Sequence, residues 1–233
     1  MSAIIILVMF MLQFEWNKHS FKLLELGQGV FTEDMVGHSH AKNSYEFHYI
    51  TDGEGKLTTD AKSYKLKKGD FFVTGPNVYH QQSTNPQNPL TEIYIYIQAS
   101  EKKTNDALVG TFLATHFYFK NNCELSYIFE NCFREVKQKK WGYKSALSGL
   151  MQLLITEVTR LYCDNFVDIE EPNDNLNDRR FILIEQAFIN NPKGITLSKL
   201  SNMIGLCERQ TQRLLQKYYG MSFSEKKAES IKK

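Results

Sequence analysis

The stretch that decides the fold begins as "YEFHYITDGEGKLTTD" (residues 45–60) and continues as "LKKGDFFVTGPNVYH" (residues 66–80). Short runs of aromatic and β-branched residues alternate here with turn signals, and "TEIYIYIQA" (91–99) extends the pattern. Strands this short, separated by tight turns, favour a barrel or sandwich over alternating strand–helix units. We therefore expect a β-barrel within residues 1–105.

The periodicity changes after residue 105. Apolar residues recur at helical spacing in 125–138 and again in 143–163, which predicts two amphipathic helices. The apolar seam of this segment, 106–163, is long enough to pack on the barrel or on a second copy of the chain. The pattern leaves both alternatives open. We expect the segment to make the chain a homodimer.

Charge divides the rest of the chain. Residues 164–178 carry six acids and no basic residue, which predicts an interdomain linker. Residues 179–233 hold eleven Lys and Arg against four acids, a balance of +7, whereas 1–178 hold the remaining 17 basic and 22 acidic residues, a balance of −5. A basic segment on an acidic body predicts a polyanionic partner.

The basic segment contains "ITLSKLSNMIGLCERQTQRLLQKYYG" (195–220). Thr196 is a plausible N-cap for a helix over 197–203, and Gly205 can supply the positive φ of a tight turn before a second helix over 208–218. Two short helices joined in this way predict a helix-turn-helix. Helical spacing puts Arg and Gln, which pair with base edges, on one face, with a lysine that can hold phosphates: Arg209, Gln212, Arg213, Gln216 and Lys217.

These residues resemble the first helix-turn-helix of the AraC/XylS family of transcriptional regulators. The resemblance implies double-stranded DNA as the partner, and a second helix-turn-helix joined by a long helix, of which 222–233 would be only the start. We therefore expect a truncated DNA-binding domain with weak, salt-dependent binding. Three positions depart from the family pattern, because Cys207, Ser201 and Thr211 stand where Ser, Ala and Leu are usual. We expect all three to loosen the module.

The barrel stretch independently resembles the two cupin motifs of the sensor domains of that family. Strand alternation pairs His38 with His40, and Glu46 with His48, on single faces, and His80 ends the second motif. The resemblance implies a small-molecule effector, such as a sugar, bound by polar side chains in the barrel: His38, His40, Glu46, His48, His80, Tyr94 and Tyr96.

The same histidines and carboxylate also suit Fe(II), Mn(II) or Zn(II), so a metal-dependent cupin enzyme is the competing interpretation. The spacing from His40 to Glu46 is longer than in metal-binding cupins, and the resemblance implies a sensor without metal. We therefore expect no cofactor and no enzyme. No Ser/His/Asp arrangement, phosphate loop or paired-carboxylate motif stands in the sequence.

The prediction is an α+β protein: a cupin-like barrel (1–105), a helical dimerisation segment (106–163), an acidic linker (164–178) and a partial DNA-binding domain (179–233). Its expected function is ligand-responsive regulation of transcription; the alternatives are the metal-dependent enzyme and a ligand-binding, dimerising protein with little DNA binding. Four scattered cysteines without metal-site spacing predict a cytoplasmic protein. The apolar run 3–12 is too short to span a membrane and predicts a buried first strand, or sequence upstream of a start at Met9 or Met11.

Overall fold

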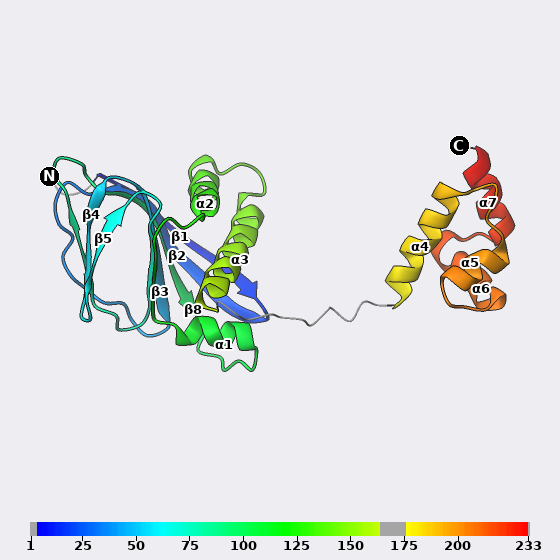
Figure 1. The fold of residues 1–233 in the computed structure, drawn as a ribbon, viewed down its shortest axis with the longest axis horizontal. Coiled ribbons are helices and arrows are strands. Elements are labelled where there is room, and N and C mark those ends of the chain that lie inside the picture. The colour runs from blue at the N-terminus through cyan, green and yellow to red at the C-terminus, as the bar shows by residue number, and fades with distance from the viewer. Residues whose placement is uncertain (1–3, 164–175, 233) are drawn as a thin grey trace. The chain divides into compact units, whose positions relative to one another are not determined.

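A computed structural model describes residues 4–163 and 176–232 (Figure 1). The chain divides into two compact units, 1–166 and 167–233. Where the chain is described, the first unit has nine strands and three helices, and the second has four helices. The described residues thus have the α+β composition that the sequence predicts, with a cupin-like β-sheet domain first and helices after it.

The first unit is built on two antiparallel sheets that face each other (Figure 1). The larger sheet has the order β1-β2-β8-β3-β6-β9, and the smaller has the order β5-β4-β7. The strands of the larger sheet are β1 (Ile4–Trp16), β2 (His19–Val30), β3 (Ser44–Asp52), β6 (Phe71–Thr74), β8 (Thr91–Ala99) and β9 (Phe117–Lys120). Those of the smaller are β4 (Glu54–Thr59), β5 (Ser63–Lys67) and β7 (His80–Thr84).

The chain passes from the larger sheet to the smaller at the turn between β3 and β4. Gly53 has a φ of +82° there, and a Cβ at this position would lie 2.0 Å from the carbonyl oxygen of Pro89. Only glycine meets both conditions without strain. The Asp-Gly signal in the sequence therefore marks the point where the chain crosses between the sheets.

Three helices cover the outer face of the larger sheet: α1 (Ala107–Ala114), α2 (Ser126–Gln138) and α3 (Tyr143–Tyr162) (Figure 1). Leu147, Met151 and Leu154 of α3 belong to the same buried cluster as Phe47 and Ile95 of the sheet. The apolar seam of the helices is thus used largely within one chain, as core. Exposed apolar side chains remain on α2, α3 and the turn between them: Tyr127, Trp141 and Leu153.

One strand lies inside the segment that the sequence predicts as helical. Residues Phe117–Lys120 form β9, which pairs with β6 at the edge of the larger sheet. The aromatic run "FYFK" has high β propensity, and pairing with the open edge of β6 decides its conformation. Because the residues on both sides of this run have helical periodicity, the strand was not predicted from the sequence.

Alternation along β3 and β8 separates two interiors. Tyr45, Phe47 and Tyr49 point toward the helices, where they join the main core. A smaller apolar cluster lies between the two sheets: Phe31, Ile50, Leu57, Leu66, Phe72 and Leu90. The polar residues of the opposite β3 face, Glu46 and His48, therefore share the space between the sheets with this cluster.

The second unit contains α4 (Leu176–Asn190), α5 (Leu197–Met203), α6 (Glu208–Tyr219) and α7 (Phe223–Lys232). Its core is a separate cluster centred on Ile184, Leu200 and Leu215. The predicted linker, 164–178, lies outside the described residues except for 176–178, which begin α4. No helix in the described parts of the chain has the length and apolar character needed to cross a membrane.

Candidate ligand-binding site

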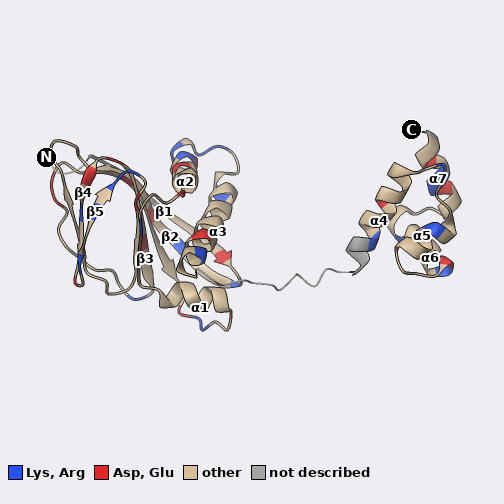
Figure 2. Cartoon of the chain, in the orientation of Figure 1, with Lys and Arg blue, Asp and Glu red and all other residues tan. Residues whose placement is uncertain are grey.

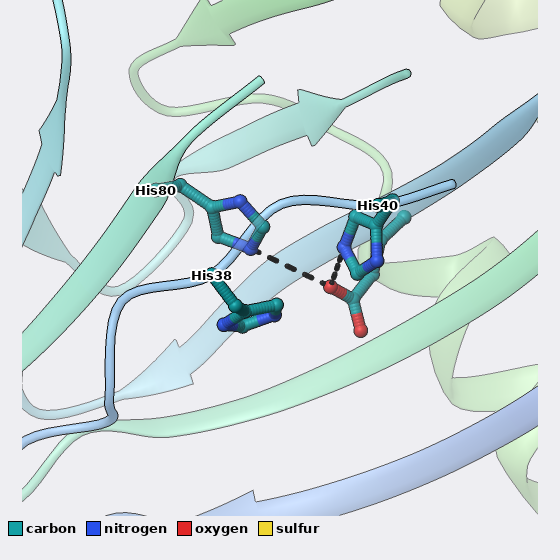
Figure 3. Close-up of side chains that lie close together, drawn as sticks. His38, His40 and His80 are labelled. Atoms are coloured by element: carbon teal, nitrogen blue, oxygen red, sulfur yellow. Dashed lines mark hydrogen bonds and ion pairs between the residues drawn. The ribbon is translucent and has the colours of Figure 1, made fainter. Parts of the chain in front are cut away.

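Three histidines and one glutamate converge between the two sheets. His38 and His40 lie on the segment that connects β2 to β3, Glu46 lies on β3, and His80 begins β7. Isolated β-bridges join His38 to His80 and His40 to Pro76, so backbone pairing fixes the segment against the barrel. Figure 3 shows the imidazoles of His38, His40 and His80 gathered around one carboxylate.

The distances in this cluster are short. His40 Nε2 lies 2.7 Å from Glu46 Oε2, and His80 Nε2 lies 3.7 Å from the same oxygen. The four residues His38, His40, Glu46 and His80 can each direct one ligand atom inward, and these atoms all lie within 4.8 Å of one another. These four residues are therefore the ones in the described chain that could hold a metal ion.

Backbone carbonyls fix the tautomers of two of the histidines. His38 Nδ1 lies 3.0 Å from the carbonyl oxygen of Val36, and His80 Nδ1 lies 3.2 Å from that of Val78. Because a carbonyl oxygen can only accept, Nδ1 carries the hydrogen in both rings. In the neutral rings, Nε2 then presents a lone pair to the cluster. Desolvation on burial lowers the pKa of His80, which keeps its ring neutral.

His48 lies behind this cluster, between two carboxylates. Its Nε2 is 3.1 Å from Glu46 Oε2, and its Nδ1 is 3.2 Å from Glu92 Oε2. Desolvation would lower the pKa of His48, but Glu92 and Glu46 outweigh it and raise the pKa to about 10. His48 is thus an imidazolium, and it has no lone pair to offer a ligand. Gln82 Nε2 donates to Glu92 Oε2 at 2.7 Å and completes the buried network.

The charge of the cluster follows from this network. Burial alone would raise the pKa of Glu46, but the positive His48 and hydrogen bonds from His40 and His48 hold it well below its usual range. The carboxyl groups of Glu46 and Glu92 thus lie on either side of the His48 ring.

The two tyrosines of β8 take different positions. Tyr96 packs its ring against His40, with the centroids 4.9 Å apart, and so forms one wall of the cluster. Tyr94 donates its hydroxyl hydrogen to Glu25 Oε1 at 2.7 Å. The structure therefore brings together five of the seven predicted ligand-binding residues, while His48 and Tyr94 make supporting contacts.

Three polar residues of the barrel interior were not predicted: Glu25, Gln82 and Glu92. Glu92 stands two residues before Tyr94, and Gln82 two residues after His80, so alternation along β8 and β7 could have found both. Glu25 follows an irregularity in the register between β2 and β8, located between Leu23 and Glu25. A β-bulge inserts an extra residue, so the alternation of inward and outward side chains before it does not predict which way Glu25 points.

The second unit presents the predicted stripe on α6. Arg209, Arg213, Gln216 and Lys217 are exposed, whereas Thr211 and Leu215 are buried in the core. Gln212 is half-buried, and its Oε1 accepts a hydrogen bond from the backbone N–H of Phe223 at 3.1 Å. Its side chain thus fixes the start of α7. Lys and Arg also occur on the neighbouring helices, interspersed with acids (Figure 2).

The predicted caps of this unit are in place. Thr196 is the N-cap of α5, where its side chain accepts from the backbone N–H of Lys199. Gly205, with a φ of +64°, makes the turn, and Cys207 is the N-cap of α6. Ser201 and Thr211, two of the unusual residues, hydrogen-bond to each other across the helix pair at 2.9 Å. Each therefore satisfies the other in the core.

A protein-family model decides the identity of the first unit. The model describes the AraC-like ligand binding domain, and it matches residues 32–155, more than half of the chain. The chain belongs to this family. The matched residues include all seven predicted ligand-binding positions, as well as α1, α2 and most of α3. The AraC-like domain thus contains both the histidine cluster and the helices that cover the larger sheet.

Comparison with solved structures returned distant likenesses. The protein YhaK from Escherichia coli matches with 14% identity over 52% of this chain and 52% of that chain, at a TM-score of 0.39. The AraC-like transcriptional activator CuxR matches with 11% identity over 92% of this chain and 80% of that chain, at a TM-score of 0.36. A predicted oxalate decarboxylase from Thermotoga maritima matches with 15% identity over 39% of this chain and 93% of that chain, at a TM-score of 0.30.

These likenesses are too distant to carry a function. No curated protein matches the chain.

Proposed function

We propose that this protein is a ligand-responsive transcriptional regulator that binds double-stranded DNA. Its AraC-like domain receives a small polar effector between the two sheets, and α6 enters the major groove. The observation that carries the proposal is the exposed Arg and Gln face of α6, set by α5 and the Gly205 turn, in a chain with an AraC-like ligand-binding domain.

The α5–α6 pair supports DNA binding by its geometry as well as its charge. α5 packs against α6 through Leu200 and Leu215, and the buried Ser201–Thr211 hydrogen bond fixes their separation. Arg209, Arg213 and Gln216 then stand on one outward face of a rigid helix. A rigid helix pair of this kind presents base-reading side chains with little loss of entropy on binding.

Tyr127, Trp141 and Leu153 are exposed on or between α2 and α3, and they support a homodimer formed through these helices. A dimer spaces two copies of α6 for two half-sites, and an effector in the barrel changes that spacing. The scattered thiols support a cytoplasmic location.

DNA binding can be tested by selecting duplexes from a random pool with the full chain, then measuring affinity by fluorescence anisotropy. Arg213→Ala is expected to weaken binding to the selected duplex by about 1–3 kcal/mol and to relax its sequence preference. Lys217→Ala should weaken binding equally across sequences and reduce the salt slope by about one. Lys68→Ala, an exposed charge of the barrel unit, is the matched control and should change nothing.

Failure to select any duplex would contradict the proposal and favour a ligand-binding protein that does not act on DNA. The other candidate is a metal-dependent enzyme, and the observation that favours it is the cluster of three histidines and Glu46. Turnover of a substrate at this cluster, abolished by Glu46→Gln, would establish the enzyme in place of the regulator.

A further inference from the structure

We propose that a hollow at the start of β2 and the end of β8 binds the anionic group of a small organic acid, a carboxylate or a phosphate. The hollow is lined by polar residues of β2, of the turn before β3 and of the end of β8, among them Ser20, Lys22, Lys42, Asn43 and Gln98. The inference deepens the proposed function by naming the chemical class of the effector, and it rests on that function only in treating the bound molecule as the effector.

The size of the hollow suits one end of a ligand. Its volume is about 250 Å3. Sites that bury a whole small molecule usually occupy about 300–1,000 Å3. The hollow is therefore large enough for a carboxylate or phosphate group, while the remainder of the molecule lies outside it.

Two lysines reach this hollow from opposite sides of β8. Lys22 on β2 pairs with Gln98, and Gln98 in turn pairs with Ser44, two residues after Lys42. Neighbouring strands are about 4.8 Å apart, so the two lysines begin about 10 Å from each other, with β8 between them. Because each lysine has a flexible four-carbon stem, both ammonium groups can contact one anion above Gln98.

The lining of the hollow carries a net positive charge. It contains two lysines and one acid, Glu101, and within the described part of the chain neither lysine forms an ion pair with a carboxylate. Both ammonium groups are therefore free to bind an external anion. Hydrogen bonds from an ammonium group to a carboxylate or phosphate are about twice as strong as neutral ones.

Neutral donors complete the lining. Ser20 Oγ accepts a hydrogen bond from Gln13 Nε2 at 3.0 Å, so its own hydroxyl hydrogen is left to donate. The side-chain amides of Asn43 and Gln98 bond to no other described residue, and each offers an NH2 group. An anion has several oxygen lone pairs to satisfy, and these groups supply donors beside the lysines.

Backbone contacts hold the turn that carries Lys42. Asn43 has a φ of +61°, a conformation that Asn adopts more readily than most residues, and the backbone N–H of Ser44 donates to the carbonyl oxygen of Ala41 at 3.2 Å. The carbonyl oxygen of Asn43 accepts from the backbone N–H of Ala99 at 2.8 Å. The turn is thus tied to the end of β8 before a ligand binds, so little backbone ordering opposes binding.

The hollow continues the strand face that carries the histidine cluster. Side chains two residues apart on a strand point to the same face, so Gln98 follows Tyr96 along β8. Tyr96 packs on the ring of His40, and Lys42 stands two residues beyond His40. A small organic acid with its anionic end at Lys22 and Lys42 can therefore extend past Tyr96 toward the cluster.

The test measures how fast each lysine of the full chain is acetylated by a water-soluble N-hydroxysuccinimide ester, with mass spectrometry as the readout. Sodium acetate and sodium phosphate are the probes for the two anionic groups, and each is compared with sodium chloride at the same ionic strength. A bound anion keeps an ammonium group protonated, so Lys22 and Lys42 should react several-fold more slowly with at least one probe. The probe that protects them distinguishes a carboxylate from a phosphate. Lys65, exposed on β5 outside the hollow, should react at an unchanged rate.

Two variants test whether both lysines hold the same anion. Lys22→Gln should abolish the protection of Lys42, and Lys42→Gln that of Lys22, because a single exposed ion pair is weak in water. Lys65→Gln is the matched control and should leave both lysines protected. Equal protection of all lysines would overturn the proposal, as would protection that survives in both variants or none from either probe.

Measurements on DNA separate this inference from the proposed function. Protection of Lys22 and Lys42 in a chain that selects no duplex leaves the anion site standing and removes the regulator. A selected duplex without protection does the reverse. Where both are found, the protecting anion should change the affinity for the duplex more in the wild type than in Lys22→Gln, at equal ionic strength. An equal change in the two proteins would overturn the bound anion as part of the effector.

Discussion

Glu46 in the barrel and Arg213 in α6 are both charged, but their surroundings are opposite. Glu46 contacts three histidines, and its neighbours His48, Glu92 and Gln82 form a closed network that is almost wholly buried. Arg213 is exposed on the outer face of α6, whose opposite face packs in the core of the second unit. The barrel site is therefore part of what stabilises its domain, whereas the exposed members of the α6 stripe, Arg209, Arg213, Gln216 and Lys217, can be changed without removing a core contact of their unit.

The largest effect is expected from breaking the network. Glu92→Ala leaves the His48 imidazolium with one carboxylate in place of two, and removal of one partner from a buried ion pair costs about 3–5 kcal/mol. Urea unfolding monitored by circular dichroism measures the loss. Glu54→Ala, an exposed carboxylate on β4, should change the free energy of unfolding by less than about 0.5 kcal/mol. Equal effects of the two substitutions would mean that Glu92 and His48 do not depend on each other.

The helical side of this comparison could be predicted from the sequence, because helix caps, turns and periodicity depend on residues that are close together in the chain. Thr196, Gly205 and the Arg–Gln stripe fell where capping, turn and periodicity rules place them. In the barrel, alternation predicted that Glu46 and His48 share a face, but it could not assign them different roles. The role of His48 depends on Glu92, which lies 44 residues away in the chain and reaches it only through the pairing of β3 with β8.

The strand β9 and the contact of Tyr94 with Glu25 escaped prediction for a related reason. β9 exists because β6 offers it an open edge, and Glu25 reaches Tyr94 because the register shifts nearby. Both depend on partners distant in sequence. The Ser201–Thr211 pair is intermediate, since each residue alone departs from the family pattern and only their contact explains both.

A smaller effect is expected at that pair, which is a buried polar contact between α5 and α6. Thr211→Val removes the acceptor of Ser201 Oγ and should cost about 1–3 kcal/mol, because a buried hydroxyl is left unsatisfied. Ser201→Ala should cost less, since Thr211 Oγ1 still donates to the Cys207 carbonyl at 3.1 Å. The double variant should recover part of the loss, and a double-mutant cycle measures this coupling. Strictly additive costs would show that the two departures do not compensate each other.

The smallest effect is expected at Cys207, where the helical unit departs from the family pattern without compensation. Its backbone N–H donates to Gln210 Oε1 at 3.2 Å, so half of a capping box is present. A thiol is a weaker acceptor than a hydroxyl for the unpaired N–H groups at the start of α6. Cys207→Ser should therefore raise the free energy of unfolding by about 0.5–1 kcal/mol.

Thermal or urea unfolding of the full chain, followed by a probe of the helical unit, measures this gain. Cys163→Ser, which replaces a thiol outside any N-cap, is the control for the loss of sulfur itself. Because Cys207 precedes α6 and belongs to neither its core face nor its exposed stripe, a better cap adds to the stability of the helix without altering the stripe. DNA affinity should stay the same while the unfolding midpoint rises. A midpoint that stays or falls would count against Cys207 as the N-cap that limits this helix.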